Sequence, residues 1–248
     1  MPDDAENAVY DDPAVFAAYQ DMRQLAGRLN EVVEQPAILS LLPDIKDLRV
    51  ADLGCGTGAM CRWLRTMGAR SVTGIDNSAR MLEAARSENG HAGIIYLNQS
   101  LETLDDLGAE HFDLIISSLA LHYVGDFCGL VRNVHRALAH GGSFVFSVEH
   151  PIVTCDRREW SAGADGVRQH WPVDRYMEEG ARQVRWLDLD VIRHHRTIGS
   201  YLNPLLDSGF VLKTVLEPAP DDAAIRQWPR LADQRRRPPF LVVRADKS

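Results

Sequence analysis

The feature that most constrains this chain is a run of three glycines at alternate positions, Gly54, Gly56 and Gly58, directly after the apolar stretch 49–53. A helical pattern begins at the last glycine. Because glycine lacks a Cβ atom, its backbone can turn sharply and approach a ligand, while the first N–H groups of the new helix face an acceptor. The pattern predicts a buried strand, a tight turn and a helix, with a ligand site where the strand ends.

Residues 49–147 alternate between short β-branched runs and longer helical periods. We expect strands at 49–53, 71–75, 94–97, 112–117 and 143–148, and helices at 58–67, 79–87 and 126–139. This order is typical of βαβ units and therefore of a parallel sheet. A leading amphipathic helix is expected from Asp12-Pro13, which is a favourable cap and first-turn pair.

The remainder of the chain follows a different pattern. Residues 151–195 mix Gly, Pro, charged and aromatic residues, and only 184–195 is strand-like, which indicates an insertion. A helix is expected from Thr197, with Pro204 predicting a kink or a restart after it. Residues 210–216 and 239–244 predict two closing strands. Since the second strand follows a Pro-Pro pair, we expect it near a sheet edge or starting outside the ladder.

An acid follows the second predicted strand. Asp76 lies eighteen residues after Gly58, where a carboxylate can accept hydrogen bonds from two ribose hydroxyls. Turn and acid together predict an adenosine-containing ligand, whereas the alternative is a tightly packed turn without a ligand. The residues GCGTGA also satisfy the dinucleotide fingerprint, so an NAD-linked oxidoreductase is an alternative. Asp52 argues against it, because a carboxylate there would repel a pyrophosphate but could serve a cationic ligand.

Composition sets the class of protein. A chain of 248 residues can form one α/β domain around one core. It has 27 basic and 35 acidic residues, a net charge of -8, and so lacks the basic excess that binding a phosphate backbone requires. The start of the chain is acidic, no apolar run could span a bilayer, and the four cysteines lack metal-ligand spacing. We therefore expect a cytoplasmic protein with no nucleic acid partner, no membrane partner and no metal.

Several motifs carry a resemblance to a known family. The turn DLGCGTG resembles the first motif of the class I S-adenosylmethionine-dependent methyltransferases. GIDNS is similar to that family's second-strand motif, HFDLIISSLALHYV to its fourth and LAHGGSFVFSVEHP to its fifth, while GFVLKTVLEP and PPFLVVRAD resemble its terminal hairpin. The resemblance implies a Rossmann-like methyltransferase fold: α/β, with a doubly wound, mostly parallel seven-stranded sheet, an N-terminal helical cap and an insertion after the fifth strand.

The resemblance also implies how the chain is divided. One methyltransferase domain would span 1–248. Within it, 1–45 would form the cap, 46–150 the cofactor-binding core, 151–195 a lid on the acceptor side, and 196–248 the C-terminal part of the core.

The cofactor implied by the resemblance is S-adenosyl-L-methionine. Gly54, Gly56 and the backbone of Cys55 would lie against its methionine part, with Asp52 and the backbone carbonyls of Ser117 and Ser118 near its ammonium group. The other residues implied are Asp76 at the ribose, Asn77 and Met81 beside ribose and adenine, Ser100 and Leu101 near the adenine, and Tyr19 closing over the cofactor. The family often has an acid where Ser100 stands, so that contact departs from its pattern.

Methyl transfer from a sulfonium is an in-line displacement, so the enzyme must chiefly place a nucleophile against the methyl carbon and exclude water. The chain lacks the N/D-P-P-Y/F turn of DNA and RNA amino-methylating relatives, and the Pro-Cys nucleophile of cytosine C5 enzymes. We therefore expect transfer to an O or N atom, and less readily to a C atom, of a small molecule. An NAD-linked oxidoreductase and a non-catalytic S-adenosylmethionine-binding protein are the alternatives.

Candidate catalytic and acceptor-binding residues follow from position and residue type. His150, His122 and Glu149 follow the fourth and fifth strands, at the edge where a general base is needed, and His150 is the first choice. Each could instead be structural. The residues expected to bind the acceptor are Tyr10, Tyr123, Trp160, Trp171, Tyr176, Trp186 and His195, although the aromatic residues of the insertion could instead form its own small core. We expect Arg235–Arg237 on a solvated face.

Overall fold

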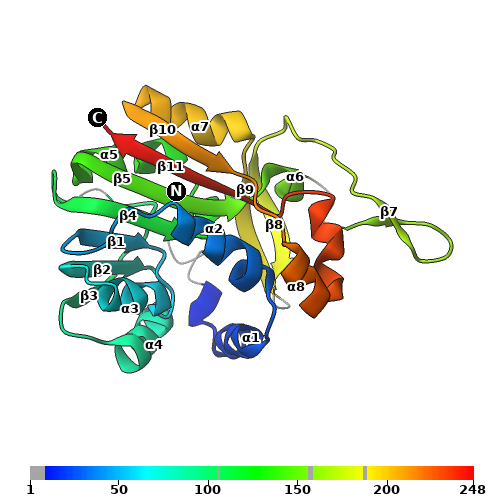
Figure 1. Cartoon of the computed structure of the whole chain (residues 1–248), viewed down its shortest axis with the longest axis horizontal. Coiled ribbons are helices and arrows are strands. Elements are labelled where there is room, and N and C mark those ends of the chain that lie inside the picture. Colours follow the sequence, from blue (N-terminus) through cyan, green and yellow to red (C-terminus); the bar gives the residue numbers. More distant parts are fainter. Residues whose placement is uncertain (1–8, 105–106, 156–158, 187–188) are drawn as a thin grey trace.

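The computed structural model describes residues 9–104, 107–155, 159–186 and 189–248. At its centre is a seven-stranded sheet with the strand order β10-β11-β5-β4-β1-β2-β3 (Figure 1). The strands are β1 (Arg49–Leu53), β2 (Ser71–Asp76), β3 (Ile94–Asn98), β4 (Phe112–Ser118), β5 (Leu138–Glu149), β10 (Phe210–Leu216) and β11 (Phe240–Lys247). The first five strands run parallel, and β11 runs antiparallel to β5 and β10. The predicted doubly wound, mostly parallel sheet is confirmed.

Helices cover both faces of the sheet, because side chains alternate along each strand and both faces are apolar. On one face, α5 (Phe127–Ala137) and α7 (Ile198–Asp207) pack on strand residues such as Ile115 and Phe146. On the other face, α2 (Gln35–Ser40) and α3 (Ala59–Thr66) pack on the intervening Leu114 and Val145. The helix α4 (Ala79–Asn89) contacts α3, β2 and β3. This packing fixes the carboxyl ends of the parallel strands, where the ligand site is expected.

Side-chain caps mark several predicted helix starts. Asp12 caps α1 (Pro13–Gln24), Ser78 caps α4, and Thr197 caps α7, each by accepting a backbone N–H of the first turn. The helix α7 runs through Pro204 as one element, so the predicted restart is not observed. The segment before the sheet also contains η2 (Val9–Asp11) and a π-helix, η3 (Asn30–Glu34), which leads into α2.

The insertion after β5 consists of short elements. It begins with α6 (Pro151–Thr154), continues with a small hairpin of β6 (Ser161–Ala162) and β7 (Arg168–His170), and ends with a longer hairpin of β8 (Gly180–Trp186) and β9 (Leu189–His195). The segment 184–195 is strand-like as predicted, but it includes parts of two antiparallel strands, and the prediction missed this hairpin as well as β6 and β7. In Figure 1 the β7 hairpin projects away from the sheet.

The closing part of the chain returns to the sheet. Between β10 and β11 lie α8 (Asp222–Gln227) and a 3-10 helix, η5 (Pro229–Arg235). The strand β11 begins at Phe240, which pairs with Glu149, so both prolines precede the ladder as predicted, but the strand lies between β10 and β5 rather than at an edge. Figure 1 shows α1, α8 and the β8–β9 hairpin gathered beyond one end of the sheet. Within the described ranges, no helix combines the length and apolar character needed to cross a membrane.

Candidate active site

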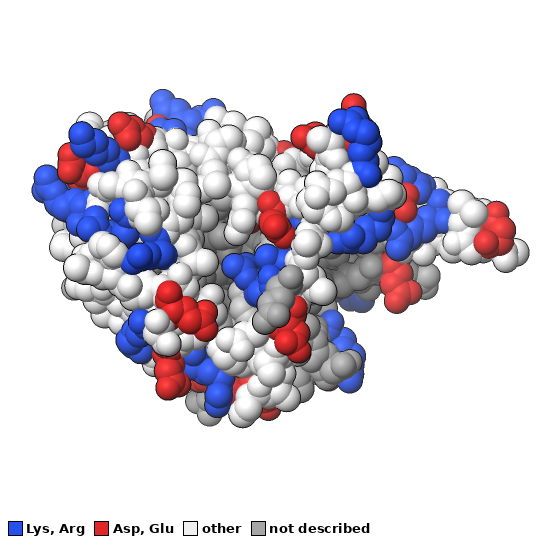
Figure 2. Space-filling view, turned by 60° about the horizontal axis from the view of Figure 1, so that its bottom comes forward, with Lys and Arg blue, Asp and Glu red and all other residues white. Residues whose placement is uncertain are grey.

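A large cavity of about 910 Å³ lies where the parallel strands end. Its wall combines the glycine turn, the segments that follow β2, β4 and β5, the N-terminal helix α1, and parts of the insertion and of η5. Figure 2 shows this face of the molecule as hollowed, with basic side chains at the hollow. Segments far apart in the sequence therefore meet around one chamber.

The glycine turn forms one wall of this cavity. Gly54, Gly56 and Gly58 have φ angles of 74°, 53° and 77°, in the left-handed region that favours glycine. A Cβ atom on Gly54 would lie 2.3 Å from the Cβ of Ala120, and one on Gly56 would lie 3.8 Å from the Tyr19 hydroxyl. The missing side chain of Gly54 makes room for Ala120, and that of Gly56 leaves the backbone open to the cavity. Because both glycines line the cavity, the turn forms a cradle in which a ligand can contact the backbone.

Asp76 ends β2 and lines the same wall. Its Oδ2 accepts the Gly56 N–H at 2.8 Å and its Oδ1 accepts the Ser78 N–H at 2.9 Å. Burial raises the pKa of Asp76, and these backbone hydrogen bonds oppose the rise. The carboxylate thus holds the turn in shape. It also stands where the sequence predicts the ribose acid, and the predicted residues Asn77, Met81, Ser100, Leu101 and Tyr19 all line the cavity with it.

Three other predicted cofactor residues lie behind the wall. Asp52 is 2% exposed, accepts a hydrogen bond from the Cys61 thiol at 3.3 Å, and has a pKa that burial raises to about 7. Cys55, half-buried, packs near the same thiol. The Ser117 hydroxyl is buried and donates to the Leu53 carbonyl at 2.7 Å. These side chains support the turn from behind, and Ser118 rather than Ser117 reaches the cavity.

Sequence reasoning missed a buried acid beside this site. Glu34 in η3 is completely buried and accepts hydrogen bonds from the hydroxyls of Ser118 and Ser147, at the ends of β4 and β5. Burial raises the pKa of its carboxyl. No local motif marks this glutamate, because its partners follow it by more than eighty residues. It ties the segment before α2 to the carboxyl edge of the sheet.

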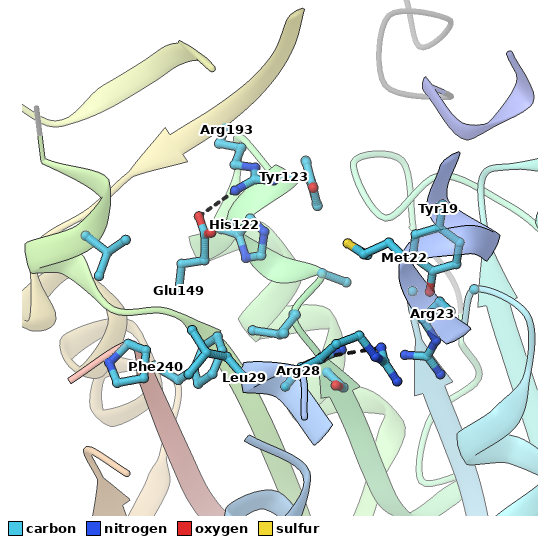
Figure 3. A pocket seen from close by; sticks show the side chains of 18 of the residues that line it. Tyr19, Met22, Arg23, Arg28, Leu29, His122, Tyr123, Glu149, Arg193 and Phe240 are labelled. Atoms are coloured by element: carbon cyan, nitrogen blue, oxygen red, sulfur yellow. Dashed lines mark hydrogen bonds and ion pairs between the residues drawn. The ribbon is translucent and has the colours of Figure 1, made fainter. Parts of the chain in front are cut away.

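Two of the three candidate catalytic residues line the cavity. Glu149 ends β5 and forms an ion pair with Arg193 at 2.7 Å, and His122 and Tyr123 in η4 (Leu121–Tyr123) lie close by (Figure 3). Arg193 also lies over the Tyr123 ring at 5.4 Å. Tyr10 lines the cavity as well and hydrogen bonds to Tyr123. The structure therefore brings together Glu149, His122, Tyr10 and Tyr123, as the sequence predicts.

His150, the first choice for the general base, lies elsewhere. It is 1% exposed, its Nδ1 accepts the Ile152 N–H at 3.2 Å, and its Nε2 lies 2.7 Å from the Glu217 carboxylate. Because Nδ1 accepts, the ring proton is on Nε2, and the side chain caps α6. Burial lowers the pKa of His150, opposed by Glu217. With both ring nitrogens engaged outside the cavity wall, the geometry corrects the prediction that His150 is the base.

Most of the predicted acceptor residues from the insertion pack on one another instead. Trp160 and Trp171 stack edge to face at 5.4 Å, and the Trp171 Nε1 donates to the Ile152 carbonyl at 2.8 Å. His195 is buried between the Thr154 hydroxyl at 2.8 Å and the Tyr176 carbonyl at 2.9 Å. None of these four predicted residues lines the cavity. They pack in two pairs, Trp160 with Trp171 and Tyr176 with His195, which is closer to the alternative of packing within the insertion; the side chain of Trp186 lies outside the described residues.

Arginines make up a large part of the wall that the sequence analysis did not anticipate. The arginines that line the cavity are Arg23, Arg28, Arg168, Arg193, Arg230 and Arg237. Arg235 and Arg236 are exposed, as predicted, but Arg237 turns inward and lies over the Trp171 ring at 4.0 Å. The expectation of a solvated face is therefore wrong for Arg237.

Comparison with known proteins identifies the family. Residues 51–146 match the family model described as a methyltransferase domain. A solved S-adenosylmethionine-dependent methyltransferase from Mesorhizobium loti is 47% identical with a TM-score of 0.82, and the match covers 86% of this chain and 97% of that one. An uncharacterised protein from Haemophilus influenzae is 35% identical over 97% of both chains. A malonyl-[acyl-carrier protein] O-methyltransferase from Enterobacter lignolyticus is 32% identical over 55% of this chain and 54% of that protein.

Fold, turn and relatives together define a class I methyltransferase. The chain belongs to the S-adenosylmethionine-dependent methyltransferases, and it is an enzyme that uses S-adenosylmethionine. The cradle at Gly54 and Gly56, with Asp76 beside it, fits that cofactor. The alternatives of an oxidoreductase and of a non-catalytic binding protein are not supported.

Proposed function

We propose that this enzyme transfers the methyl group of S-adenosylmethionine to an oxygen or nitrogen atom of a small molecule. The observation that carries the proposal is one continuous cavity, which extends from the glycine turn and Asp76 to Glu149 and Arg193. Its volume of about 910 Å³ is at the upper end of the range for small-molecule pockets. A cofactor and a small acceptor can therefore share one chamber.

The residues of the chain divide the work between binding and exclusion of water. When bound, S-adenosylmethionine supplies a methyl carbon made electrophilic by its sulfonium. We assign Gly54, Gly56 and Asp76 to hold and orient this cofactor. We assign the cap (1–45) and the insertion (151–195) to cover the acceptor, since Tyr10 of the cap and Val153 of the insertion both line the cavity. Orientation of reactants in such a chamber contributes about 7 to 11 kcal/mol to lowering the barrier.

A hydroxyl or N–H acceptor must lose a proton, and Glu149 and His122 are the groups we assign to take it. The ion pair with Arg193 at 2.7 Å orients the Glu149 carboxylate, and His122 lies in the same wall (Figure 3). Oxygen is the favoured acceptor atom, because relatives at 32% and 25% identity are named as O-methyltransferases of malonyl-[acyl-carrier protein] and of ubiquinone biosynthesis.

The proposal is tested by incubating the enzyme with methyl-deuterated S-adenosylmethionine and the small-molecule filtrate of a bacterial extract. We expect a product heavier by one labelled methyl group in mass spectrometry. Glu149→Gln should lower the rate of its formation by about 10² to 10⁴. Glu83→Gln, an exposed position on α4, is the matched control and should leave the rate unchanged. Label that enters only protein or nucleic acid, when the whole extract is supplied, would contradict a small-molecule acceptor.

A further inference from the structure

The charge of the cavity is opposite to that of the chain. The whole sequence carries a net charge of -8. Among the described residues that line the cavity, six are arginines and four are carboxylates: Asp76, Glu102, Glu149 and Asp233. Figure 2 shows basic side chains at the hollow of this face. Cations concentrated in a large chamber of an acidic chain indicate a ligand that carries negative charge.

Arg237 is a lining arginine for which the described part of the chain shows no ion pair. It lines the cavity, and its guanidinium lies over the rings of Trp171 at 4.0 Å and Trp160 at 5.9 Å. Its Nε and Nη1 are buried and have no hydrogen-bond partner in the part of the chain that the structure describes. Burial lowers the pKa of Arg237 to about 10, so the side chain still carries its charge at neutral pH.

The neighbouring carboxylates are already engaged. Glu149, the acid whose charge acts on Arg237, is paired with Arg193 at 2.7 Å. Asp233 is paired with Arg168 at 3.0 Å and with the exposed Arg236 at 3.1 Å. This part of the wall thus keeps a positive charge, and a half-buried guanidinium without an anion is costly.

Glu149, the acid whose charge acts on Arg237, lies across the chamber from residues of α1. Glu149 and Arg193 lie on one side of the chamber, and Tyr19, Met22 and Arg23 on the other (Figure 3). Apolar side chains, including Leu231 and Phe240, complete the wall. The chamber therefore offers an acceptor both an apolar surface and a cationic anchor.

We propose that the methyl acceptor is an organic anion with a carboxylate or phosphate group, which Arg237 binds. This inference rests on the proposed function, because it concerns the acceptor of the same cavity. Guanidinium groups bind both oxyanions with charge-assisted hydrogen bonds, and stacking on Trp171 holds the Arg237 side chain in place. The aromatic residues of the insertion then act as support for the arginine.

The test measures binding of matched probes to the complex with S-adenosylhomocysteine by calorimetry. The probes are phenylacetate, phenyl phosphate and the neutral phenylacetamide. We expect at least one anion to bind with at least about tenfold higher affinity than the amide. Arg237→Gln should remove this preference and Arg237→Lys should retain part of it, whereas Arg226→Gln, an exposed arginine on α8, should behave as the wild type. Whichever of the two anions binds with the higher affinity shows whether the acceptor carries a carboxylate or a phosphate group.

Equal affinity for the amide, no binding of either anion, or unchanged preference in Arg237→Gln would overturn the inference. The affinity for S-adenosylhomocysteine, measured for each variant, checks that it is folded. A second measurement separates this inference from the proposed function: the small-molecule filtrate is divided on an anion-exchange resin before labelling. Transfer in the retained pool supports the anionic acceptor. Transfer only in the unretained pool overturns it and leaves small-molecule methylation intact, and transfer in neither pool contradicts the proposed function itself.

Discussion

Replacement of Asp76 by Ala should weaken both the folded state and cofactor binding. The carboxylate accepts two backbone N–H groups, from Gly56 at 2.8 Å and from Ser78 at 2.9 Å, and it lines the cavity. Hydrogen bonds to a charged group contribute about 1.5 to 3 kcal/mol each. The cost of burying the carboxylate, visible in its raised pKa, offsets part of this contribution. We therefore expect the free energy of unfolding to fall by about 2 to 4 kcal/mol without ligand.

For a chain of this size, that loss corresponds to a melting temperature lower by roughly 4 to 16 °C. Urea unfolding measures the stability, and calorimetry should show an affinity for S-adenosylhomocysteine weaker by about tenfold or more. Asp126→Ala is the control, because Asp126 caps α5 through Gly129 at 2.8 Å but does not line the cavity. It should cost about 1 kcal/mol of stability and leave the affinity unchanged. An Asp76→Ala protein with wild-type stability would refute the role assigned to the carboxylate in shaping the turn.

Three further substitutions test the description of the site. Gly56→Ala places a Cβ atom in the cavity and strains the backbone, whose φ of 53° favours glycine, so calorimetry should show S-adenosylhomocysteine binding at least about tenfold weaker. An affinity equal to that of the wild type would mean that the turn does not contact the cofactor. The pKa of Asp52 is raised to about 7 in the folded state, so the folded protein binds more protons than the unfolded chain between roughly pH 4 and 7. The free energy of unfolding should therefore fall as the pH rises through this window, by up to about 4 kcal/mol. Urea unfolding of Asp52→Asn should lack this loss, and parallel pH profiles of the two proteins would contradict the buried carboxyl. His150→Ala removes the cap of α6 and the contact with Glu217, so it should lower the unfolding free energy by about 1 to 2 kcal/mol. Steady-state assays should show a methyl-transfer rate within about threefold of the wild type, and a rate lower by a factor of about 10² or more would restore His150 as the base.

The parts of the fold that the sequence predicts well are those determined locally. The strands β1 and β10 adjoin Gly54 and Gly209, and β4 contains the apolar run Leu114–Ile116, so their positions are visible in the residues themselves. The insertion is different. Its strands β6 and β7 are two and three residues long, and hairpins this short lack the length over which a period can be recognised. Their structure depends on contacts with the rest of the molecule.

The same distinction separates the two ends of the site. Gly54, Gly56 and Asp76 lie within one βαβ unit, so their spacing alone predicts the cofactor end. The acceptor end joins Glu149 to Arg193 and places Arg237 over Trp171, in pairs that are far apart in the sequence. No spacing rule predicts such pairs, because they depend on how the insertion and η5 fold back over the sheet.

The error over His150 has a specific physical origin. Successive side chains at the end of a strand point to opposite sides, so Glu149 and His150 cannot both face one cavity from an extended backbone. Glu149 faces it, and His150 is turned toward Glu217 and α6. Both residues are candidates because they are close in sequence to the carboxyl edge of the sheet. The alternation of side chains along the strand allows only one of them to face the cavity.

Net charge gives limited information about a cavity, because it averages over a surface whose regions act separately. The overall charge of -8 argues against a polyanionic partner, since such a partner contacts an extended face. The net charge says little about binding of a small anion, because the electrostatic field within a chamber depends on the nearest charged groups. Salt screens exposed charges beyond about 8 Å at physiological ionic strength. Exposed acids on the outer surface therefore do not cancel Arg193 and Arg237 in the cavity wall. An acidic enzyme can in this way keep nucleic acids away and still bind an anionic acceptor.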